Sequence, residues 1–212
     1  YRDSFKEVKK EFNDLFETNE EILLDPGSIC FVNSVLSKIN LNSYVGDPIG
    51  DLYQTFAGTE MRGNEGQFFT PMHAVDWIIE SLDLKKGEKI IDPACGSGAF
   101  LYKATKYLLS KNVPKSEINN CIYGIEKDNY LSKLAKTHIS LLTGNFTNIF
   151  CGDSVERIGK DGDILPIDFE EAFDIVVANP PFGAKIKIGS DSARKRLDLS
   201  KKWSHDLKNN DF

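Results

Sequence analysis

The sequence lacks the patterns that usually identify a metal-binding or disulfide-bonded protein. Its 212 residues hold only three histidines and four cysteines, which are Cys30, Cys95, Cys121 and Cys151, and no two cysteines have CxxC spacing. Zinc sites require clustered cysteine and histidine ligands, so we expect no metal. Isolated thiols without a preceding signal peptide favour a reducing compartment, and we expect the cytoplasm.

Long apolar runs and an excess of basic residues are also missing. No stretch approaches the roughly 18 apolar residues that a membrane-spanning helix needs, so no membrane partner is expected. Lys and Arg number 26 against 32 Asp and Glu, and this net charge of −6 argues against binding nucleic acid by bulk charge alone. One stretch after residue 182 is locally basic and is a candidate for phosphate contacts; it contains Lys185, Lys187, Arg194, Lys195, Arg196, Lys201, Lys202 and Lys208.

The most informative stretch present is residues 92–100, which reads Asp-Pro-Ala-Cys-Gly-Ser-Gly-Ala-Phe. It follows the short apolar strand signal Ile90-Ile91 and opens an apolar-periodic segment, so it lies at a turn from a strand to a helix. Gly96 and Gly98 permit positive φ, and the helix N-terminus offers free N–H groups, which suits a ligand lying against the backbone. Asp92 can accept a hydrogen bond from a ligand ammonium.

Two further acids follow predicted strands. The strand 122–126 ends in Glu126, from which a carboxylate can hold both hydroxyls of a ribose. The strand 149–153 ends in Asp153, for which an Asx turn is the commoner role after glycine. Of the histidines, His138 lies on an apolar helix face and is predicted to be a packed residue, whereas His73 is expected on the surface.

Asn179-Pro180-Pro181-Phe182 directly follows the apolar strand 175–178. The Asn179 side-chain carbonyl and the Pro180 backbone carbonyl can each accept one N–H of an amine, so that its lone pair is localised as positive charge develops. Phe182 offers a face on which a base can stack. An Asn-Pro-Pro loop is by itself most often only a rigid turn, but its order after the glycine turn and the ribose acid reverses that preference.

Together these motifs resemble the S-adenosylmethionine-dependent amino-methyltransferases, whose cofactor motif is of the Asp-Pro-x-Cys-Gly-Ser-Gly kind and whose catalytic motif is Asn-Pro-Pro-Phe. A Gly-Gln-Phe-Phe-Thr-Pro segment at 66–71 extends the resemblance to modification subunits of type I restriction-modification systems. The resemblance implies Asn179, Pro180, Pro181 and Phe182 as catalytic residues. It implies S-adenosylmethionine as cofactor, with Asp153 accepting from the adenine amine, and a site formed by Gln67, Phe68, Phe69, Thr70, Asp92, Pro93, Ala94, Gly96, Ser97, Gly98, Glu126, Lys127, Asp153, Ser154 and Asn179.

The fold predicted is α/β. Strands that alternate with helices indicate a parallel sheet, and the resemblance implies a Rossmann-like methyltransferase sheet of strand order 3-2-1-4. Residues 1–62 are expected to form a helical N-terminal segment and residues 63–212 a partial methyltransferase domain. Both ends look like cuts, so we expect a fragment that could self-associate through the uncovered edge of the last strand.

Local sequence patterns predict the positions of several helices, their N-caps and one loop. An amphipathic helix is expected over 2–16 with Asp3 or Ser4 as N-cap, then helices over 29–40 and 49–56. Thr70 is a candidate N-cap with Pro71 at the first helical position. Residues 155–171 are expected to be a solvated loop.

The resemblance favours methylation of adenine N6 in double-stranded DNA, together with a specificity subunit and a restriction subunit as partners. Two alternatives stay open. The acceptor could be guanine N2 of ribosomal RNA or glutamine N5 of a protein, or the chain could bind cofactor or partner without turnover. An NAD-dependent dehydrogenase is disfavoured because no third glycine follows Gly98 in the expected fingerprint position.

Overall fold

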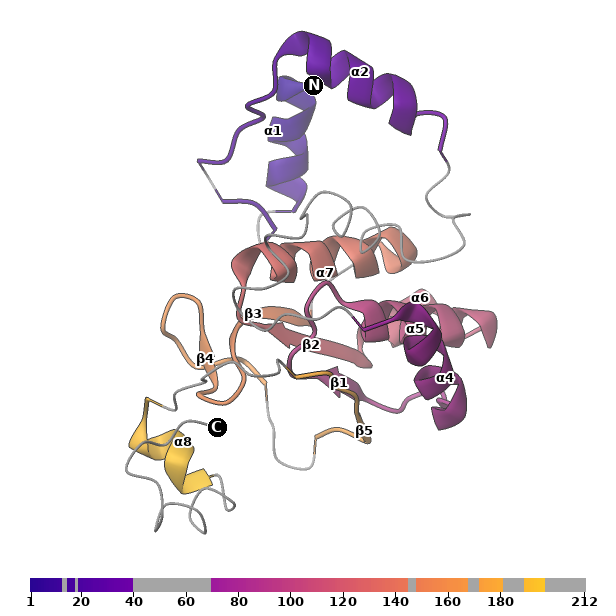
Figure 1. The fold of residues 1–212 in the computed structure, drawn as a ribbon, viewed down its shortest axis with the longest axis vertical. Helices are drawn as coiled ribbons and strands as arrows, with labels where there is room; N and C mark the ends of the chain where they lie inside the picture. The colour runs from indigo at the N-terminus through magenta and orange to yellow at the C-terminus, as the bar shows by residue number, and fades with distance from the viewer. Residues whose placement is uncertain are drawn as a thin grey trace. The chain divides into compact units, whose positions relative to one another are not determined.

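The computed structural model describes residues 1–12, 15–17, 19–39, 70–144, 148–167, 172–180 and 189–196 (Figure 1). The chain divides into two units, residues 1–45 and 46–212. The predicted domain boundary between residues 62 and 63 lies outside the described residues, as does the helix predicted over 49–56. No helix in the described ranges is both long and apolar enough to cross a membrane.

Among its described residues the first unit has two helices, α1 (Arg2–Glu11) and α2 (Pro26–Leu36). In α2, Asp25 is the N-cap and accepts from the Gly27 N–H at 2.9 Å, which explains why Asp-Pro-Gly starts a helix here. The predicted cap of α1 is wrong. The Tyr1 carbonyl already accepts from the Phe5 N–H at 2.7 Å, so Tyr1 takes the N-cap position and no side chain caps the helix. The helix also ends before Phe12, whose φ of −119° and ψ of 57° are not helical.

The second unit is built on a five-stranded sheet of order β4-β3-β2-β1-β5. Its strands are β1 (Ile90–Asp92), β2 (Ile122–Glu126), β3 (Ile149–Asp153), β4 (Ile158–Gly159) and β5 (Ile175–Val176). Strand β1 pairs in parallel with both β2 and β5, and β2 pairs in parallel with β3. The predicted order 3-2-1-4 is therefore confirmed, with β5 as the fourth parallel strand.

Strand β4 corrects the expectation of a plain loop over 155–171. It pairs antiparallel with β3, and Gly152 lies opposite Gly159. A Cβ at Gly152 would lie 2.4 Å from the Ile158 carbonyl oxygen, so β3 and β4 can approach this closely only with glycine at position 152. The sequence of residues 155–171 is polar and rich in turn-forming residues, so it has no alternating apolar pattern that would predict β4.

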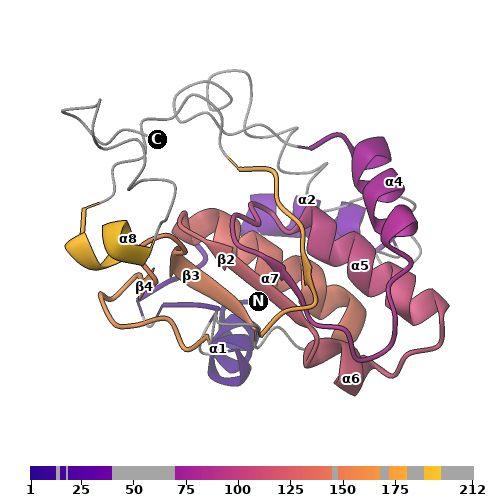
Figure 2. The same ribbon diagram turned by 90° about the horizontal axis from the view of Figure 1, so that it is seen from below.

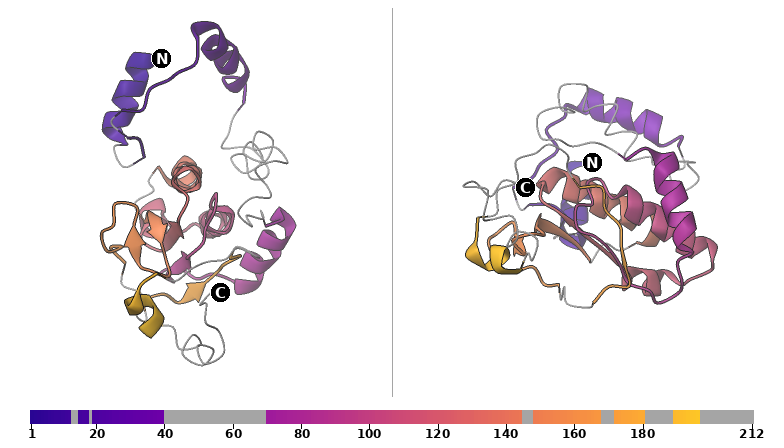
Figure 3. Two further views of the ribbon diagram at one scale, coloured as in Figure 1. Left: turned by 60° about the vertical axis from the view of Figure 1, so that its left-hand side comes forward. Right: turned by 60° about the horizontal axis from the view of Figure 1, so that its bottom comes forward.

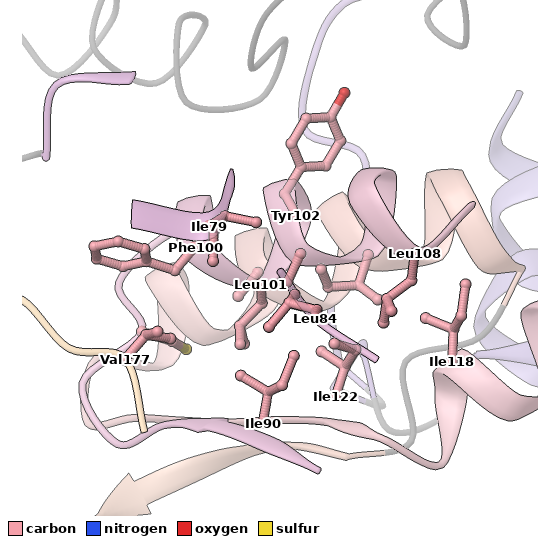
Figure 4. Packing of buried hydrophobic residues seen from close by; sticks show 14 of the residues in the cluster. Ile79, Leu84, Ile90, Phe100, Leu101, Tyr102, Leu108, Ile118, Ile122 and Val177 are labelled. Atoms are coloured by element: carbon pink, nitrogen blue, oxygen red, sulfur yellow. The ribbon is translucent and has the colours of Figure 1, made fainter. Parts of the chain in front are cut away.

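Four helices of this unit pack on one face of the sheet: α4 (Met72–Leu82), α5 (Ala99–Ser110), α6 (Lys115–Asn119) and α7 (Asn129–Thr143). The left view of Figure 3 looks almost along α5 and α7, which lie on the same side of the strands. Leu101 and Leu108 of α5 point toward Ile90 and Ile122 of the sheet (Figure 4). All four side chains are at most 3% exposed, so this layer is the main core.

The opposite face of the sheet carries a smaller cluster. Because side chains alternate along a strand, Ile91 and Ile125 point away from the helices and pack with Leu165. Tyr123 meets Phe173 edge to face at 5.1 Å on the same side. In the described sheet β5 is an edge strand with Val176 64% exposed, and self-association through this edge remains a prediction.

Candidate active site at the carboxyl edge of the sheet

All four parallel strands finish at one end of the sheet, which we call the carboxyl edge. Asp92, Glu126 and Asp153 are the last residues of β1, β2 and β3, and Asn179 follows β5 by three residues. The Val177 N–H donates to the Ile91 carbonyl at 3.0 Å, which continues the β1–β5 pairing toward Asn179. The fold therefore brings the predicted acids and the predicted catalytic asparagine to one edge, where parallel sheets bind ligands.

Asp92 is the most deeply buried acid of this edge, with 1% of its surface exposed. In the described part of the chain its carboxylate accepts one hydrogen bond, from the Ala94 N–H at 3.0 Å. Burial raises the pKa of Asp92 to about 7, and the charge of Glu126 adds to the rise. A carboxyl group kept from water without a cation is suited to receive a ligand ammonium.

The glycine turn that follows is shaped by two residues with positive φ, Gly96 at 54° and Gly98 at 87°. Gly98 is the N-cap of α5, and a Cβ there would lie 3.2 Å from the Cα and Cβ of Ala135 on α7. At Gly96 a Cβ would meet no atom of the described residues within 4 Å, so among these residues Gly96 borders open space. Gly98 is thus required by packing, whereas Gly96 leaves room for a ligand against the backbone.

Glu126 holds the glycine turn in place. Its Oε2 accepts from the Gly96 N–H at 2.8 Å, and its Oε1 accepts from the Asp128 N–H at 2.8 Å. Burial raises the pKa of Glu126 although these backbone hydrogen bonds oppose the rise. Each carboxylate oxygen has a second lone pair, so the group can accept ribose hydroxyls without releasing the turn.

Asp153 forms the Asx turn that Gly-Asp favours. Its Oδ1 accepts from the Val155 and Glu156 N–H groups at 2.9 and 3.0 Å, and its Oδ2 accepts from Lys127 Nζ at 2.9 Å. Burial raises the pKa of Asp153, but the Glu156 N–H and the Lys127 ammonium outweigh it, so that the pKa is lowered overall. The predicted adenine contact must therefore use Oδ2, and Ser154 lies inside the turn.

Asn179 is joined to the predicted cofactor segment by a direct hydrogen bond. Its Nδ2 donates to Thr70 Oγ1 at 2.9 Å, across 109 positions of sequence. Figure 2 shows the segment 172–180 (orange) ending on the same side of the unit where the segment beginning at residue 70 (purple) enters α4. The N-cap role predicted for Thr70 is wrong, because Pro71 is the N-cap of α4 and Met72 its first residue.

The remaining predicted residues lie partly inside and partly outside the described ranges. Pro93, Ala94 and Ser97 belong to the glycine turn, and Ser97 is 3% exposed. Pro180 is exposed directly after Asn179. Outside the described residues lie Gln67, Phe68, Phe69, Pro181 and Phe182.

In the described ranges no three His, Cys, Asp or Glu side chains gather as metal ligands would.

The sequence did not predict that a buried histidine, His138, packs against the glycine turn. His138 is fully buried, its Nδ1 lies 3.2 Å from the Ser97 carbonyl, and its ring stacks on Tyr102 at 3.8 Å. The prediction that His138 is a packed residue is confirmed, yet its partner in the turn could not be read from the sequence. His138 lies one helical turn after Ala135, whose Cα and Cβ would lie 3.2 Å from a Cβ at Gly98, and only the structure shows this proximity.

Part of the basic stretch is anchored beside this edge. In the short helix α8 (Asp191–Arg196), Arg196 donates to the Val155 carbonyl at 3.1 Å. Glu156 accepts from the Gly189 N–H at 2.6 Å and from the Ser190 N–H at 3.2 Å. The turn after Asp153 therefore fixes the described part of the basic stretch.

Comparison with known proteins gives consistent matches. A family model described as N-6 DNA Methylase matches residues 44–212. The methylase subunit of the type I restriction enzyme EcoEI from Escherichia coli is 29% identical over 187 residues, which cover 83% of this chain and 35% of the relative. The MjaIX methylase subunit from Methanocaldococcus jannaschii is 36% identical over 141 residues, which cover 65% of this chain and 23% of the relative. The chain thus spans about a third or less of the length of these curated relatives.

Solved structures agree on the fold. A chain from a type I restriction-modification system gives a TM-score of 0.59 at 24% identity, covering 91% of this chain and 39% of that one. A protein from Listeria monocytogenes assigned to the class I S-adenosylmethionine-dependent methyltransferases gives a TM-score of 0.58 at 19% identity, covering 85% of this chain and 52% of that one. At these identities the likeness establishes a class I methyltransferase sheet.

Proposed function

The chain belongs to the N-6 DNA methylase family, and from this premise we propose that it carries the catalytic site of a site-specific DNA methyltransferase that methylates adenine N6. The observation that carries the proposal is the direct pairing of β5 with β1. This pairing places Asn179 beside the strand that ends in Asp92 and the glycine turn. A methyl donor and an amine acceptor must meet within bonding reach, and neighbouring parallel strands supply that proximity.

S-adenosylmethionine is the cofactor we propose, because the residues present fit its chemical groups. Asp92 is a buried acid that pairs with no cation in the described ranges, which suits the ammonium of the methionine end. In the part of the chain that the structure describes, Gly96 leaves open space against the backbone, and Glu126 can accept ribose hydroxyls. When bound, the cofactor supplies an electrophilic methyl group on a sulfonium.

The chain's own part in the reaction is to orient the target amine. The carbonyl end of the Asn179 amide and the Pro180 carbonyl accept its two N–H groups, so the nitrogen lone pair leaves conjugation with the ring. Pro180 lacks an N–H that could compete for these acceptors. Phe182 is proposed to stack on the extruded base, which offsets part of the few kcal/mol that extrusion costs.

The names of the relatives suggest the setting. The similar chains from Escherichia coli and Methanocaldococcus jannaschii are methylase subunits of type I restriction enzymes, so we propose that this chain belongs to such a subunit in the cytoplasm. A separate specificity subunit would then read the DNA sequence, with a restriction subunit as a further partner. The basic stretch around Arg194 and Lys195 is proposed to contact DNA phosphate.

The test is transfer of labelled methyl from S-adenosylmethionine to duplex DNA by the intact protein, with N6-methyladenine identified in the digest. We expect Asn179→Ala to reduce turnover by about a hundredfold or more, as loss of one preorganised partner does. Asn33→Ala, at an exposed position of α2, is the matched control and should retain full activity. Label in ribosomal RNA or protein but not in DNA would contradict the proposal, and so would cofactor binding without transfer to any acceptor.

A further inference from the structure

Glu156 joins the turn after Asp153 to the described part of the basic stretch. Its backbone N–H donates to Asp153 Oδ1 at 3.0 Å, so Glu156 belongs to the Asx turn. Its side-chain carboxylate accepts from the Gly189 N–H at 2.6 Å, from the Ser190 N–H at 3.2 Å and from the Ser190 hydroxyl. Gly189 and Ser190 immediately precede α8, so the carboxylate binds the start of this helix to the turn.

The other end of α8 is held by the same turn. Arg196, the last residue of the helix, donates to the Val155 carbonyl at 3.1 Å and to the Glu156 carbonyl at 3.3 Å. Ser190 Oγ accepts from the Ala193 N–H at 3.1 Å, so the hydroxyl that binds Glu156 also caps the helix. A helix of six residues is not stable alone in water, so the contacts with the turn hold α8 in its position.

These contacts give Glu156 a role opposite to the one that its charge suggests. A carboxylate beside basic residues that contact DNA repels phosphate, so its removal would ordinarily strengthen DNA binding. We infer that Glu156 is instead a positioning residue, which holds α8 so that the basic side chains of this helix meet DNA phosphate. This inference rests on the proposed function, of which DNA contact by the basic stretch is a part. Glu156 acts through α8 and takes no part in the methyl transfer.

Two substitutions of Glu156 remove the same charge but differ in hydrogen bonding. Glu156→Gln retains a side-chain oxygen that can accept from the Gly189 and Ser190 N–H groups. Its NH2 group can donate to the Ser190 hydroxyl. Glu156→Ala removes all of these contacts. Because the two variants are equal in charge, a difference between their DNA affinities measures the hydrogen bonds that hold α8.

The binding test measures the affinity of the intact protein for a labelled DNA duplex by fluorescence anisotropy at several salt concentrations. We expect Glu156→Ala to raise the DNA Kd by about three- to tenfold and to reduce the salt slope by about 1 to 2, as loss of one or two phosphate contacts does. Glu156→Gln should bind no more weakly than the wild type, with an unchanged slope. A Glu156→Ala variant that binds DNA as tightly as Glu156→Gln would overturn the inference.

A double substitution tests whether Glu156 acts through α8. Lys195 is an exposed residue of this helix. Lys195→Ala should reduce the salt slope by about 1 in the wild type and should change it little in Glu156→Ala, because the helix is then already displaced. Additive effects of the two substitutions would contradict the inference. Glu11→Ala, at an exposed position of α1, is the matched control and should leave the DNA Kd and the slope unchanged.

Hydrogen exchange reads the position of α8 without DNA. The Ala193 N–H donates to Ser190 Oγ, and the Arg194 N–H donates to the Ser190 carbonyl at 3.2 Å. We expect the amides of residues 189–196 to exchange faster in Glu156→Ala than in the wild type or Glu156→Gln. Wild-type exchange in Glu156→Ala would overturn the inference even where DNA is methylated.

Cofactor affinity and methyl transfer separate this inference from the proposed function. The Kd for S-adenosylmethionine should change less than about threefold in Glu156→Ala, because the backbone N–H that Asp153 binds is retained. A loss found only in cofactor affinity would overturn the inference. A wild type that binds duplex DNA, shows the expected difference between the two variants and transfers no methyl group would instead refute the proposed function and leave the role of Glu156 standing.

Discussion

Affinity for S-adenosylmethionine should depend on pH through Asp92. The carboxyl group is 1% exposed, and burial followed by the charge of Glu126 raises its pKa to about 7 in the cofactor-free chain. Only the ionised form can pair with the ammonium of the cofactor. Binding at a pH below 7 must therefore first remove the proton, and this step weakens the observed affinity.

The size of the effect follows from the pKa. About a tenth of Asp92 is ionised at pH 6 and about nine tenths at pH 8, so the Kd should be about tenfold larger at pH 6. This factor corresponds to about 1.4 kcal/mol of binding free energy. Burial also raises the pKa of Glu126, so a Glu126 variant is needed beside the Asp92 variant.

Calorimetry at pH 6, 7 and 8 measures the dependence, and two variants assign it. Asp92→Asn should bind weakly at every pH with a nearly flat profile, because no proton remains to be removed. Glu126→Gln should keep most of the slope. A wild-type Kd that stays constant between pH 6 and 8, or a slope that survives in Asp92→Asn, would refute the assignment to Asp92.

The same pKa makes a matching prediction for stability. Since the pKa of Asp92 is raised in the fold, its stabilising contribution is present at acidic pH and is lost as pH rises through 7. Relative to Asp92→Asn, the cofactor-free wild type should lose about 2 to 3 kcal/mol of unfolding free energy between pH 5 and pH 8. Chemical denaturation of both proteins at the two pH values gives the difference directly.

Two further predictions concern residues around the edge. Gly98→Ala should lower the unfolding free energy by about 1 to 3 kcal/mol, because φ is 87° and a Cβ would lie 3.2 Å from Ala135. Gly96→Ala, where a Cβ meets nothing within 4 Å, should cost less, and equal losses in denaturation would contradict the packing argument. Lys127→Ala should raise the pKa of Asp153 in an NMR titration, because the ammonium 2.9 Å away helps to lower it. Stability should change by less than about 1 kcal/mol, since the Lys127 side chain is 74% exposed.

Those parts of the fold and site that depend on local pattern could be predicted from the sequence. Ile90-Ile91 before a glycine turn indicated a strand entering a helix, and β1 is followed by α5. A resemblance supplied the strand order, which pairing of β1 with β2 and β5 confirms. Burial of His138 followed from its place on an apolar helix face.

What the sequence could not supply were contacts between segments that are distant in the chain. Thr70 and Asn179 are 109 positions apart, and nothing local distinguishes a capping threonine from one that holds an amide. Lys127 and Asp153 meet only because β2 and β3 pair in parallel. Strand β4 escaped prediction because two residues are too few to form an alternating pattern.

These distant contacts give the site a common property. Several of its polar groups already form hydrogen bonds with one another. Glu126 accepts from the glycine turn, Asp153 accepts from Lys127, and Asn179 donates to Thr70. A ligand can then use the remaining lone pairs, as at Glu126 and at Asp153 Oδ2. A ligand that takes the place of exposed Lys127 at Oδ2 loses little, because an exposed ion pair is weak. Asp92 differs because it is buried and no cation among the described residues pairs with it. A ligand ammonium there would add an interaction rather than replace one, and this is why we assign the pH dependence to that residue.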